Sequence, residues 1–256
     1  MHKLIVSIIL LVLTVMVVPR GYTEIVEDGL VGYWSFDQIV GKTVKDGLKK
    51  HDGAISKGNI KSANNGKIGK ALLFDGEPDF VEIDGANDFI ANADFTWCAW
   101  IKTKEDLGGI VAKTPSEFDT DAQGAKTFFL NAGTLTFDTG WVGVINGLKT
   151  VNDDKWHHLA FAYDGKKKVL YIDGEVDIDR AAKGEFGVKG VDVIIGGAIT
   201  ERFAMGLIDE VAIFNTALTA NDVKGIIKGG MASVLGTTAV SPKSRLTTTW
   251  SSIKSQ

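Results

Sequence analysis

The sequence predicts an all-β fold, a sandwich of two antiparallel sheets that ends in one short helix. Short apolar runs alternate with glycine-containing turns at a spacing of roughly 8–12 residues, as in other sandwiches. The 256 residues include 30 glycines and only 4 prolines, which suits many tight turns. Two of the runs, in residues 155–177, are separated by Asp164-Gly165, a dipeptide typical of hairpins. The sheets are therefore expected to be antiparallel.

The first strand of that hairpin, residues 156–163, is expected in the middle of a sheet. Alternation places Leu159, Phe161 and Tyr163 on one face. The other face carries Trp156, His158, Ala160 and Ala162. Because neither face is strongly polar, both should be covered by other layers of the protein.

Apolar runs bounded by turn residues predict the other strands. In chain order the predicted strands are residues 30–36, 72–74, 80–83, 95–102, 109–113, 127–130, 134–138, 156–163, 169–172, 191–195 and 205–214. No strand is predicted in the polar stretch 41–70 or in the glycine-rich segment 139–154. Residues 219–228 predict a helix, because Thr219 and Asp222 have the spacing of a capping box; Gly229-Gly230 should end it.

Four motifs in this order resemble the laminin-G-like, concanavalin A-like jelly-roll domains. They are FDGEPDFVEI at residues 74–83, DFTWCAWIKT at 94–103, the central Trp-His-His, Tyr-Asp-Gly and Tyr-x-Asp-Gly series, and GLIDEVAIFNTALTANDV at 206–223. The resemblance covers residues 29–229. It implies a jelly roll whose first and last strands lie side by side.

Three parts of the chain are expected. Residues 1–23 have the layout of a signal peptide, with an apolar run at residues 4–18 that is shorter than the ~20 residues of a membrane-spanning helix. Cleavage before Glu24 would give a secreted protein with no membrane span; the alternative is retention as an N-terminal anchor. Residues 29–230 form the laminin-G-like domain. Residues 231–256 are a Ser/Thr-rich tail, either disordered or a docking segment.

Composition argues against several classes of function. The formal net charge is only −4, and no basic stripe interleaves with aromatic residues, so nucleic acid is not expected as a partner. The single cysteine, Cys98, excludes an internal disulfide and is expected to be a small buried residue. No phosphate loop or nucleophile motif is present.

The acids of residues 205–214 suggest a cation site. Simple alternation puts Asp209 on one face and Glu210 on the other, each among apolar neighbours, and an unpaired buried carboxylate is costly. Calcium is the candidate, because it accepts carboxylate and turn carbonyl oxygens. Many jelly rolls of the resembling family hold a structural calcium between the first and last strands. This resemblance implies the ligand set Asp37, Asp75, Gly76, Asp79 and Asp209; the alternative is that these acids cap turns and form salt bridges.

Enzymatic chemistry is not expected. His157 and His158 are adjacent on a strand, so they point to opposite faces and cannot ligate one ion together. Glycosidases of the resembling fold use a Glu-x-Asp-x-x-Glu strand. The nearest run, residues 175–180, has Arg180 in place of the last acid.

Carbohydrate binding is the leading functional hypothesis. It requires an exposed aromatic face beside polar groups, and Trp141 followed by Asn146 in a glycine-rich segment is the best candidate; Phe203 beside Arg202 is the second. The alternative for Trp141 is to close one end of the sandwich. We therefore expect a secreted, non-enzymatic adhesion or recognition module for an extracellular glycan or glycosylated surface. The alternative is a structural or protein-binding module attached through its tail.

Overall fold

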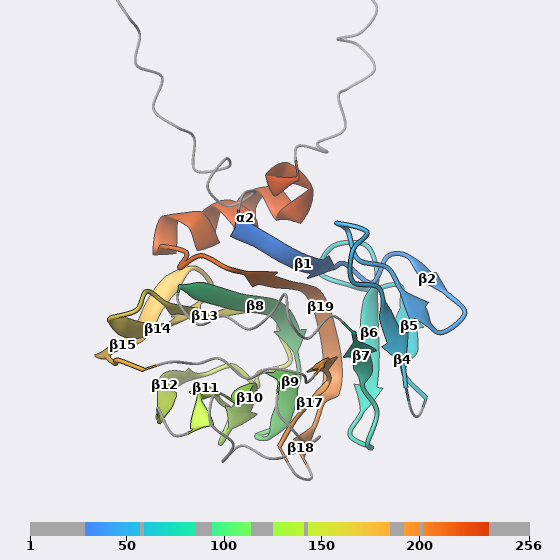
Figure 1. The fold of residues 1–256 in the computed structure, drawn as a ribbon. Coiled ribbons are helices and arrows are strands. Elements are labelled where there is room, and N and C mark those ends of the chain that lie inside the picture. The colour runs from blue at the N-terminus through green and yellow to red at the C-terminus, as the bar shows by residue number, and fades with distance from the viewer. Residues whose placement is uncertain are drawn as a thin grey trace, which may run out of the picture.

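A computed structural model describes residues 29–56, 59–84, 94–113, 125–140, 143–184, 192–199 and 202–235. Two large antiparallel sheets are stacked face to face, and one helix lies on the outer face of one of them (Figure 1). The predicted sandwich is confirmed. The signal-peptide prediction for residues 1–23, Trp141, and most of the predicted tail lie outside the described residues.

Sheet A contains both the first and the last strand of the described chain. Its strand order is β15-β14-β13-β8-β19-β6-β5, and β1 also pairs with β19. The strands are β1 (Leu30–Trp34), β5 (Lys61–Ala63), β6 (Ala71–Asp75), β8 (Phe95–Lys102), β13 (His157–Tyr163), β14 (Lys167–Ile172), β15 (Glu175–Ala181) and β19 (Met205–Phe214). The central hairpin is confirmed as β13 and β14, and β13 lies inside the sheet between β14 and β8.

Sheet B has the order β12-β11-β10-β9-β16-β7-β4-β3-β2. Its strands are β2 (Ile39–Val40), β3 (Thr43–Val44), β4 (Gly53–Ile55), β7 (Val81–Ile83), β9 (Gly108–Lys113), β10 (Lys126–Asn131), β11 (Thr134–Asp138), β12 (Val144–Thr150) and β16 (Val193–Ile195). A small separate hairpin consists of β17 (Gly197–Ile199) and β18 (Arg202–Phe203). The prediction missed β2 to β5, β12, β15, β17 and β18, which are very short or have largely exposed side chains.

The main core fills the space between the sheets. Leu159, Phe161 and Tyr163 of β13 face it, as alternation predicts. The ring of Phe161 stacks on Phe137 of β11, with centroids 3.6 Å apart and planes at 9°, so this pair joins the two sheets directly. Ala160 and Ala162 face the opposite side of sheet A, where they contact a second cluster of buried residues.

Strand β19 pairs with two strands in succession on the side that faces away from β8. Its first half pairs with β6 from Met205 to Ile208, and its second half pairs with β1 from Val211 to Phe214. Between the halves, the pairing with β8 shifts at a β-bulge. Glu210 sits in this bulge with φ of 52°, the left-handed region that a glutamate rarely adopts. The expected neighbours, the first and last strands, are therefore paired.

Because of the bulge, the prediction that Asp209 and Glu210 lie on opposite faces of the strand is wrong. Ile208, Val211 and Ile213 all belong to the core between the sheets, so the alternation changes phase at residues 209–210. Asp209 pairs across the sheet with Trp100, on the outer face, and Glu210 accepts a hydrogen bond from the Tyr33 hydroxyl at 2.7 Å on that same face. Both acids lie on one side, because the extra residue of a bulge rotates the chain.

Both carboxylates are almost fully buried. Asp209 accepts hydrogen bonds from the backbone amides of Ile68 at 3.1 Å and Glu210 at 2.8 Å. Burial raises the pKa of Asp209 to about 7, and burial also raises the pKa of Glu210 to about 7, with the charges of Asp209 and Asp37 adding to the effect. The two acids thus retain protons to an unusually high pH.

The helix α2 (Ala220–Val234) packs on the outer face of sheet A. The predicted capping box of Thr219 and Asp222 is present. The predicted end at residues 229–230 is only a kink: Gly230 has φ of 67°, and the chain then returns to helix. Met231 and Val234 are buried against this face together with Cys98 and Phe214. The helix therefore continues past residue 230, and its last turn packs on sheet A.

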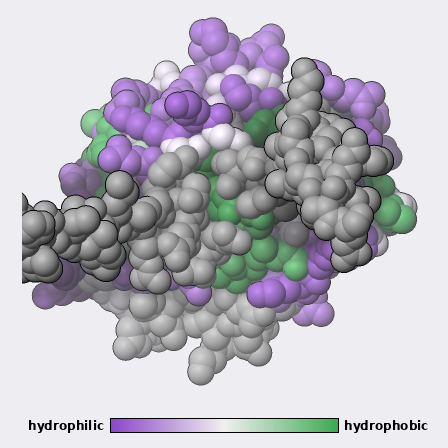
Figure 2. All heavy atoms as spheres, turned by 90° about the horizontal axis from the view of Figure 1, so that it is seen from above, coloured by the Kyte–Doolittle hydropathy of each residue, from purple (hydrophilic) through white to green (hydrophobic). Residues whose placement is uncertain are grey.

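Seen from the side of α2, most of the described surface is hydrophilic, with hydrophobic atoms concentrated near its middle (Figure 2). Within the described ranges, no helix has the length and apolar character needed to cross a membrane. Cys98 is buried as expected, and burial raises its pKa to about 12, so the thiol stays protonated.

The buried acids predict how stability changes with pH. A carboxyl whose pKa is raised on folding stabilises the fold below its unfolded pKa, and this contribution is lost as pH rises through about 7. For Glu210 the difference amounts to about 3 kcal/mol at most, and roughly 1 kcal/mol moves the Tm of a domain this size by about 2–4 °C. We expect the Tm of the wild-type protein to fall by several degrees relative to Glu210→Gln between pH 5 and pH 8.

The measurement is thermal unfolding of both proteins followed by circular dichroism across this range. Titrating groups that are not coupled to Glu210 cancel because both proteins contain them. Glu77→Gln, a change at an exposed acid, is the control and should follow the wild type. Parallel curves for wild type and Glu210→Gln would show that the buried acid does not titrate as described.

Candidate functional site

The candidate sugar-binding segment forms the edge hairpin of sheet B. Asn146 lies on β12 in register with Thr136 of β11, and both side chains point away from the core, since Leu135, Phe137 and Ile145 point into it. The Thr136 hydroxyl donates a hydrogen bond to Oδ1 of the exposed Asn146 at 3.1 Å. The amide nitrogen of Asn146 donates no hydrogen bond within the described part of the chain, so it is a donor that a ligand can use.

The loop of this hairpin is held from the opposite sheet by Lys168. This residue lies on β14 of sheet A and faces inward with Leu170, so its ammonium group is buried. The Nζ atom donates hydrogen bonds to Oγ1 of Thr139, at 2.7 Å, and to the carbonyl of Gly143. Burial lowers the pKa of Lys168 to about 8, and the charge of Asp138 opposes this effect. The loop that contains Trp141 is thus fastened on both sides of that residue.

The other end of β12 is held by Asp177 of β15. Its carboxylate accepts hydrogen bonds from the backbone amides of Leu148 at 2.6 Å and Lys149 at 3.2 Å. A side chain at Gly147 would be crowded, because its Cβ would lie 2.9 Å from the backbone carbonyl oxygen of Leu135 and 2.7 Å from Oδ2 of Asp177. Asp177 belongs to the run that most resembled a glycosidase motif, and here it lies on the edge strand of sheet A and binds the backbone of the edge strand of sheet B. Sequence patterns did not assign this role to it.

The five residues predicted for calcium are not gathered at one point. Strand β19 meets the corner at Asp75 through Met205, and Asp209 is four residues further along, about 13 Å away. The predicted contact between Asp209 and the turn of Asp75 and Gly76 is therefore wrong. Gly76 instead donates its amide hydrogen to the carbonyl of Ala204 at 2.9 Å.

The carboxylates of this set already bind backbone amides. Asp37 accepts from Lys70 at 2.7 Å, Asp75 from Glu77 at 3.1 Å, and Asp79 from Asn59 at 3.0 Å. Among the described residues, no three His, Cys, Asp or Glu side chains are placed to hold a metal ion together. These five residues do not fit a calcium cage, and calcium itself stays a prediction from the family resemblance.

The two histidines face opposite sides of sheet A, as their adjacency predicts. His157 bridges two carboxylates, with Nδ1 at 2.8 Å from Asp173 and Nε2 at 3.0 Å from Asp153. His158 is buried edge-on against Trp100, with ring centroids 5.2 Å apart. Burial lowers the pKa of His158 to about 4, so it is neutral at pH 7. His157 is therefore satisfied, whereas Nδ1 of His158 has no hydrogen-bond partner within the described residues.

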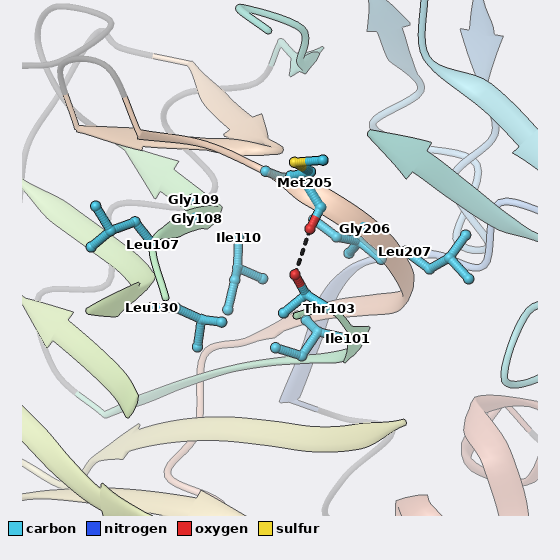
Figure 3. Close-up of a pocket in the computed structure, with 12 residues that line it drawn as sticks. Ile101, Thr103, Leu107, Gly108, Gly109, Ile110, Leu130, Met205, Gly206 and Leu207 are labelled. Carbon is cyan, nitrogen blue, oxygen red and sulfur yellow. Dashed lines mark hydrogen bonds between the residues drawn. The ribbon is translucent and has the colours of Figure 1, made fainter. Parts of the chain in front are cut away.

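A small cavity lies between the sheets near the start of β19 (Figure 3). Its volume is about 20 Å³, and mostly apolar residues line it, including Ile101, Leu107, Ile110 and Leu130. This is the size of roughly one water molecule, and an apolar lining offers such a molecule few hydrogen bonds. The cavity is too small to hold a sugar.

The second aromatic candidate lies on the small hairpin beside sheet B. Phe203 pairs with Gly197, and the guanidinium group of Arg202 lies 5.2 Å from the ring centroid of Phe129. Both Arg202 and Phe203 are half-buried. This aromatic therefore offers less exposed ring surface than the hypothesis required.

Two stacked antiparallel sheets, with the first and last strands paired and an edge hairpin carrying polar side chains, define the lectin-like jelly-roll class of protein. The family profile of the concanavalin A-like lectin/glucanases superfamily matches residues 75–224. The chain belongs to this superfamily. No curated protein sequence is significantly similar to it.

Solved structures with the same fold include binding domains and an enzyme. One is domain 4 of AbnA, an extracellular GH43 arabinanase from Geobacillus stearothermophilus, solved in complex with arabinotriose. It is 21% identical to this chain with a TM-score of 0.63, and the alignment covers 77% of this chain and 98% of that domain. The binding domain of Paraclostridial Mosquitocidal Protein 1 is 17% identical (TM-score 0.61; 78% and 52% covered). Trypanosoma rangeli sialidase is 16% identical (TM-score 0.56; 78% and 32% covered). The chain thus spans about half of the second protein and a third of the third.

The tie between Asp177 and β12 yields a prediction about local stability. Replacing Asp177 with alanine removes a charged acceptor from two amides, and such bonds contribute about 1.5–3 kcal/mol each. We expect Asp177→Ala to accelerate hydrogen exchange at the Leu148 and Lys149 amides by about tenfold or more, measured by NMR. Asp179→Ala is the matched control on the same strand, because its carboxylate only approaches the exposed Lys167, at 3.6 Å. Equal exchange in the two variants would mean that Asp177 does not hold the edge strand.

Proposed function

We propose that this protein is a secreted, non-catalytic module that recognises an extracellular glycan through the β11–β12 hairpin. The observation that carries the proposal is the double fastening of this hairpin by Lys168 and Asp177, two residues of the opposite sheet. A hairpin held at both ends presents its polar groups in one geometry, which lowers the entropy lost on binding. The exposed amide group of Asn146, whose Oδ1 atom is held by the buried Thr136 hydroxyl, matches the hydroxyl groups of a saccharide.

The comparisons support a saccharide as the ligand. The superfamily is described by its lectins and glucanases, and one structure of the same fold was solved in complex with arabinotriose. Fold alone does not determine function, so these similarities raise the expectation without assigning a sugar. The predicted signal peptide would place the protein where polysaccharides are accessible.

A non-catalytic role agrees with the positions of the acids near the hairpin. Glycoside hydrolysis uses two carboxylates about 5 to 9.5 Å apart on either side of the scissile bond. Asp177 is occupied by two backbone amides, and Asp138 accepts a hydrogen bond from the amide of Gly140 at 2.9 Å. Both acids serve the backbone of the hairpin. We therefore propose binding without turnover.

Binding to a glycan array tests this proposal. Asn146→Ala removes one hydrogen-bonding side chain, worth about 1 kcal/mol, and should weaken binding roughly fivefold. Trp141→Ala removes the aromatic face that the sequence places in the fastened loop, and should weaken binding about tenfold or more. Val40→Ala, at an exposed residue of β2, is the control and should bind as the wild type does.

Repeating the array with calcium and with EDTA tests whether the predicted ion is needed. Binding that survives both conditions would remove calcium from the proposal and leave the glycan in place. Absence of binding to every glycan in both conditions would favour the alternative, a protein-binding module attached through its tail. Release of reducing sugars from a polysaccharide panel would overturn the non-catalytic part of the proposal.

A further inference from the structure

A larger hollow lies on the outer face of sheet A, where β19 begins. Its volume is about 390 Å³, within the range of small-ligand sites. It lies on the other side of β19 from the small cavity of Figure 3, and the two share Thr103, Met205, Gly206 and Leu207. None of the candidate binding or metal residues predicted from the sequence lines it.

The floor of the hollow is apolar although it faces solvent. Leu207 of β19 lies in register between Leu73 of β6 and Lys102 of β8, so these three side chains form one row across the sheet. Leu73 is 40% exposed and Met205 is 49% exposed, unlike the great majority of apolar strand residues in this protein. A compact apolar surface inside a hollow is suited to an apolar ligand face.

The rim of the hollow is polar and carries no net charge. Lys102 and Lys104 provide two positive charges, and Glu105 and Asp154 provide two negative charges. The ammonium group of Lys104 lies 3.4 Å from the carboxylate of Asp154. The balance of charge disfavours an anion or a cation as the ligand, whereas hydroxyl groups can both donate to these carboxylates and accept from these ammonium groups.

Thr103 holds the three segments around the hollow together. Its hydroxyl donates to the carbonyl of Met205 at 2.6 Å, as Figure 3 shows, and accepts from the amide of Glu105 at 3.0 Å. Its carbonyl accepts from the amide of Asp154 at 3.0 Å. Gly206 is required here: its φ is 125°, and a Cβ would lie 2.5 Å from the carbonyl of Lys102. The floor and rim are therefore fixed relative to each other before any ligand arrives.

We infer that this hollow is a second saccharide subsite, for a neutral sugar ring that lays its C–H face on Met205 and Leu73 and directs its hydroxyl groups to Glu105, Asp154 and Lys102. The inference rests on the proposed glycan-binding function and adds a second point of contact. The residues of β12 separate the loop that carries Trp141 from Asp154, so the two sites lie about 20 Å apart along that strand. Avidity from the two sites requires one polysaccharide to reach both faces of the sandwich, because Asn146 faces outward from sheet B and the hollow faces outward from sheet A.

The experiment uses the methionines of the full chain. There are only four; Met231 is a buried residue of α2 and Met205 lines the hollow, so Met231 is an internal reference. The protein, labelled with ¹³C at its methionine methyl groups and with ¹⁵N, is titrated with neutral trisaccharides (arabinotriose, cellotriose and mannotriose) and with the acidic trisaccharide trigalacturonate. Met205→Leu assigns the methyl signal.

We expect a neutral trisaccharide to shift the Met205 methyl signal in a saturable way and to leave that of Met231 unchanged. Met205→Glu places a charge on the apolar floor and should weaken this binding by about tenfold or more. In this variant the binding is followed through the Lys104 amide signal. Val40→Glu makes the same change at another exposed apolar residue and should have no effect.

The contradicting outcomes separate the two proposals. If neutral trisaccharides shift the Asn146 amide but not the Met205 methyl, the hollow is not a subsite and the proposed function stands. If no trisaccharide shifts either signal, both the proposed function and this inference fall. A response at Met205 to trigalacturonate alone would overturn the assignment of a neutral ligand, and equal affinity in Met205→Glu and the wild type would overturn the assignment of the floor.

Discussion

The bulge at Asp209 and Glu210 is the constraint on which the rest of the fold depends. Without it, side chains of β19 would alternate between the two faces along the whole strand. With Ile208 in the core, Val211 and Ile213 would then point away from the core. With it, one strand pairs first with β6 and then with β1, which brings the beginning and the end of the domain together. The cost is a left-handed glutamate and two buried carboxylates, and hydrogen bonds from Ile68 and Tyr33 offset part of it.

Local patterns predicted the buried strands and failed at the polar ones. The runs around Phe95, Phe137 and Phe161 are apolar enough that alternation and turn signals suffice, and their rings meet in the core. Strand β12 buries only Ile145, and β15 exposes most of its side chains, so neither has the hydrophobic pattern of a strand. Their pairing comes from neighbouring strands, which a local pattern does not contain. The phase change at Glu210 was hidden for a similar reason, because no glycine marks the left-handed position.

The sequence predicted the exposed polar group of the candidate site. It did not predict the residues that hold this group in place. Asn146 follows from composition alone, as a polar residue in a glycine-rich segment. Lys168 contacts Thr139 from 29 positions away in the chain, so its partner depends on how the sheets stack. One signal was present: alternation with Leu170 and Ile172 places Lys168 on the inward face, where an ammonium group needs acceptors. The calcium set failed because register, not adjacency of strands, decides that Met205 rather than Asp209 meets Asp75.

The two ends of the sandwich are held by different chemistry. At the hollow, neutral hydrogen bonds of Thr103 join three segments. At the end that carries the β11–β12 loop, three lysines are buried, and burial lowers the pKa values of Lys113, Lys126 and Lys168 to about 8, 7 and 8. Apolar residues of similar size would often stabilise such a position, so these lysines are not explained by stability alone.

For Lys168 the structure gives a specific reason for retaining the lysine. Its Nζ atom reaches two acceptors that belong to the two sides of one loop, Thr139 and Gly143. An apolar side chain would fill the same volume but leave the loop free to adopt other conformations. Because a neutral amine still carries two N–H groups, both bonds persist when the proton is lost near pH 8. Lys168 thus fixes the conformation of the β11–β12 loop, and it does so whether or not its amine is charged.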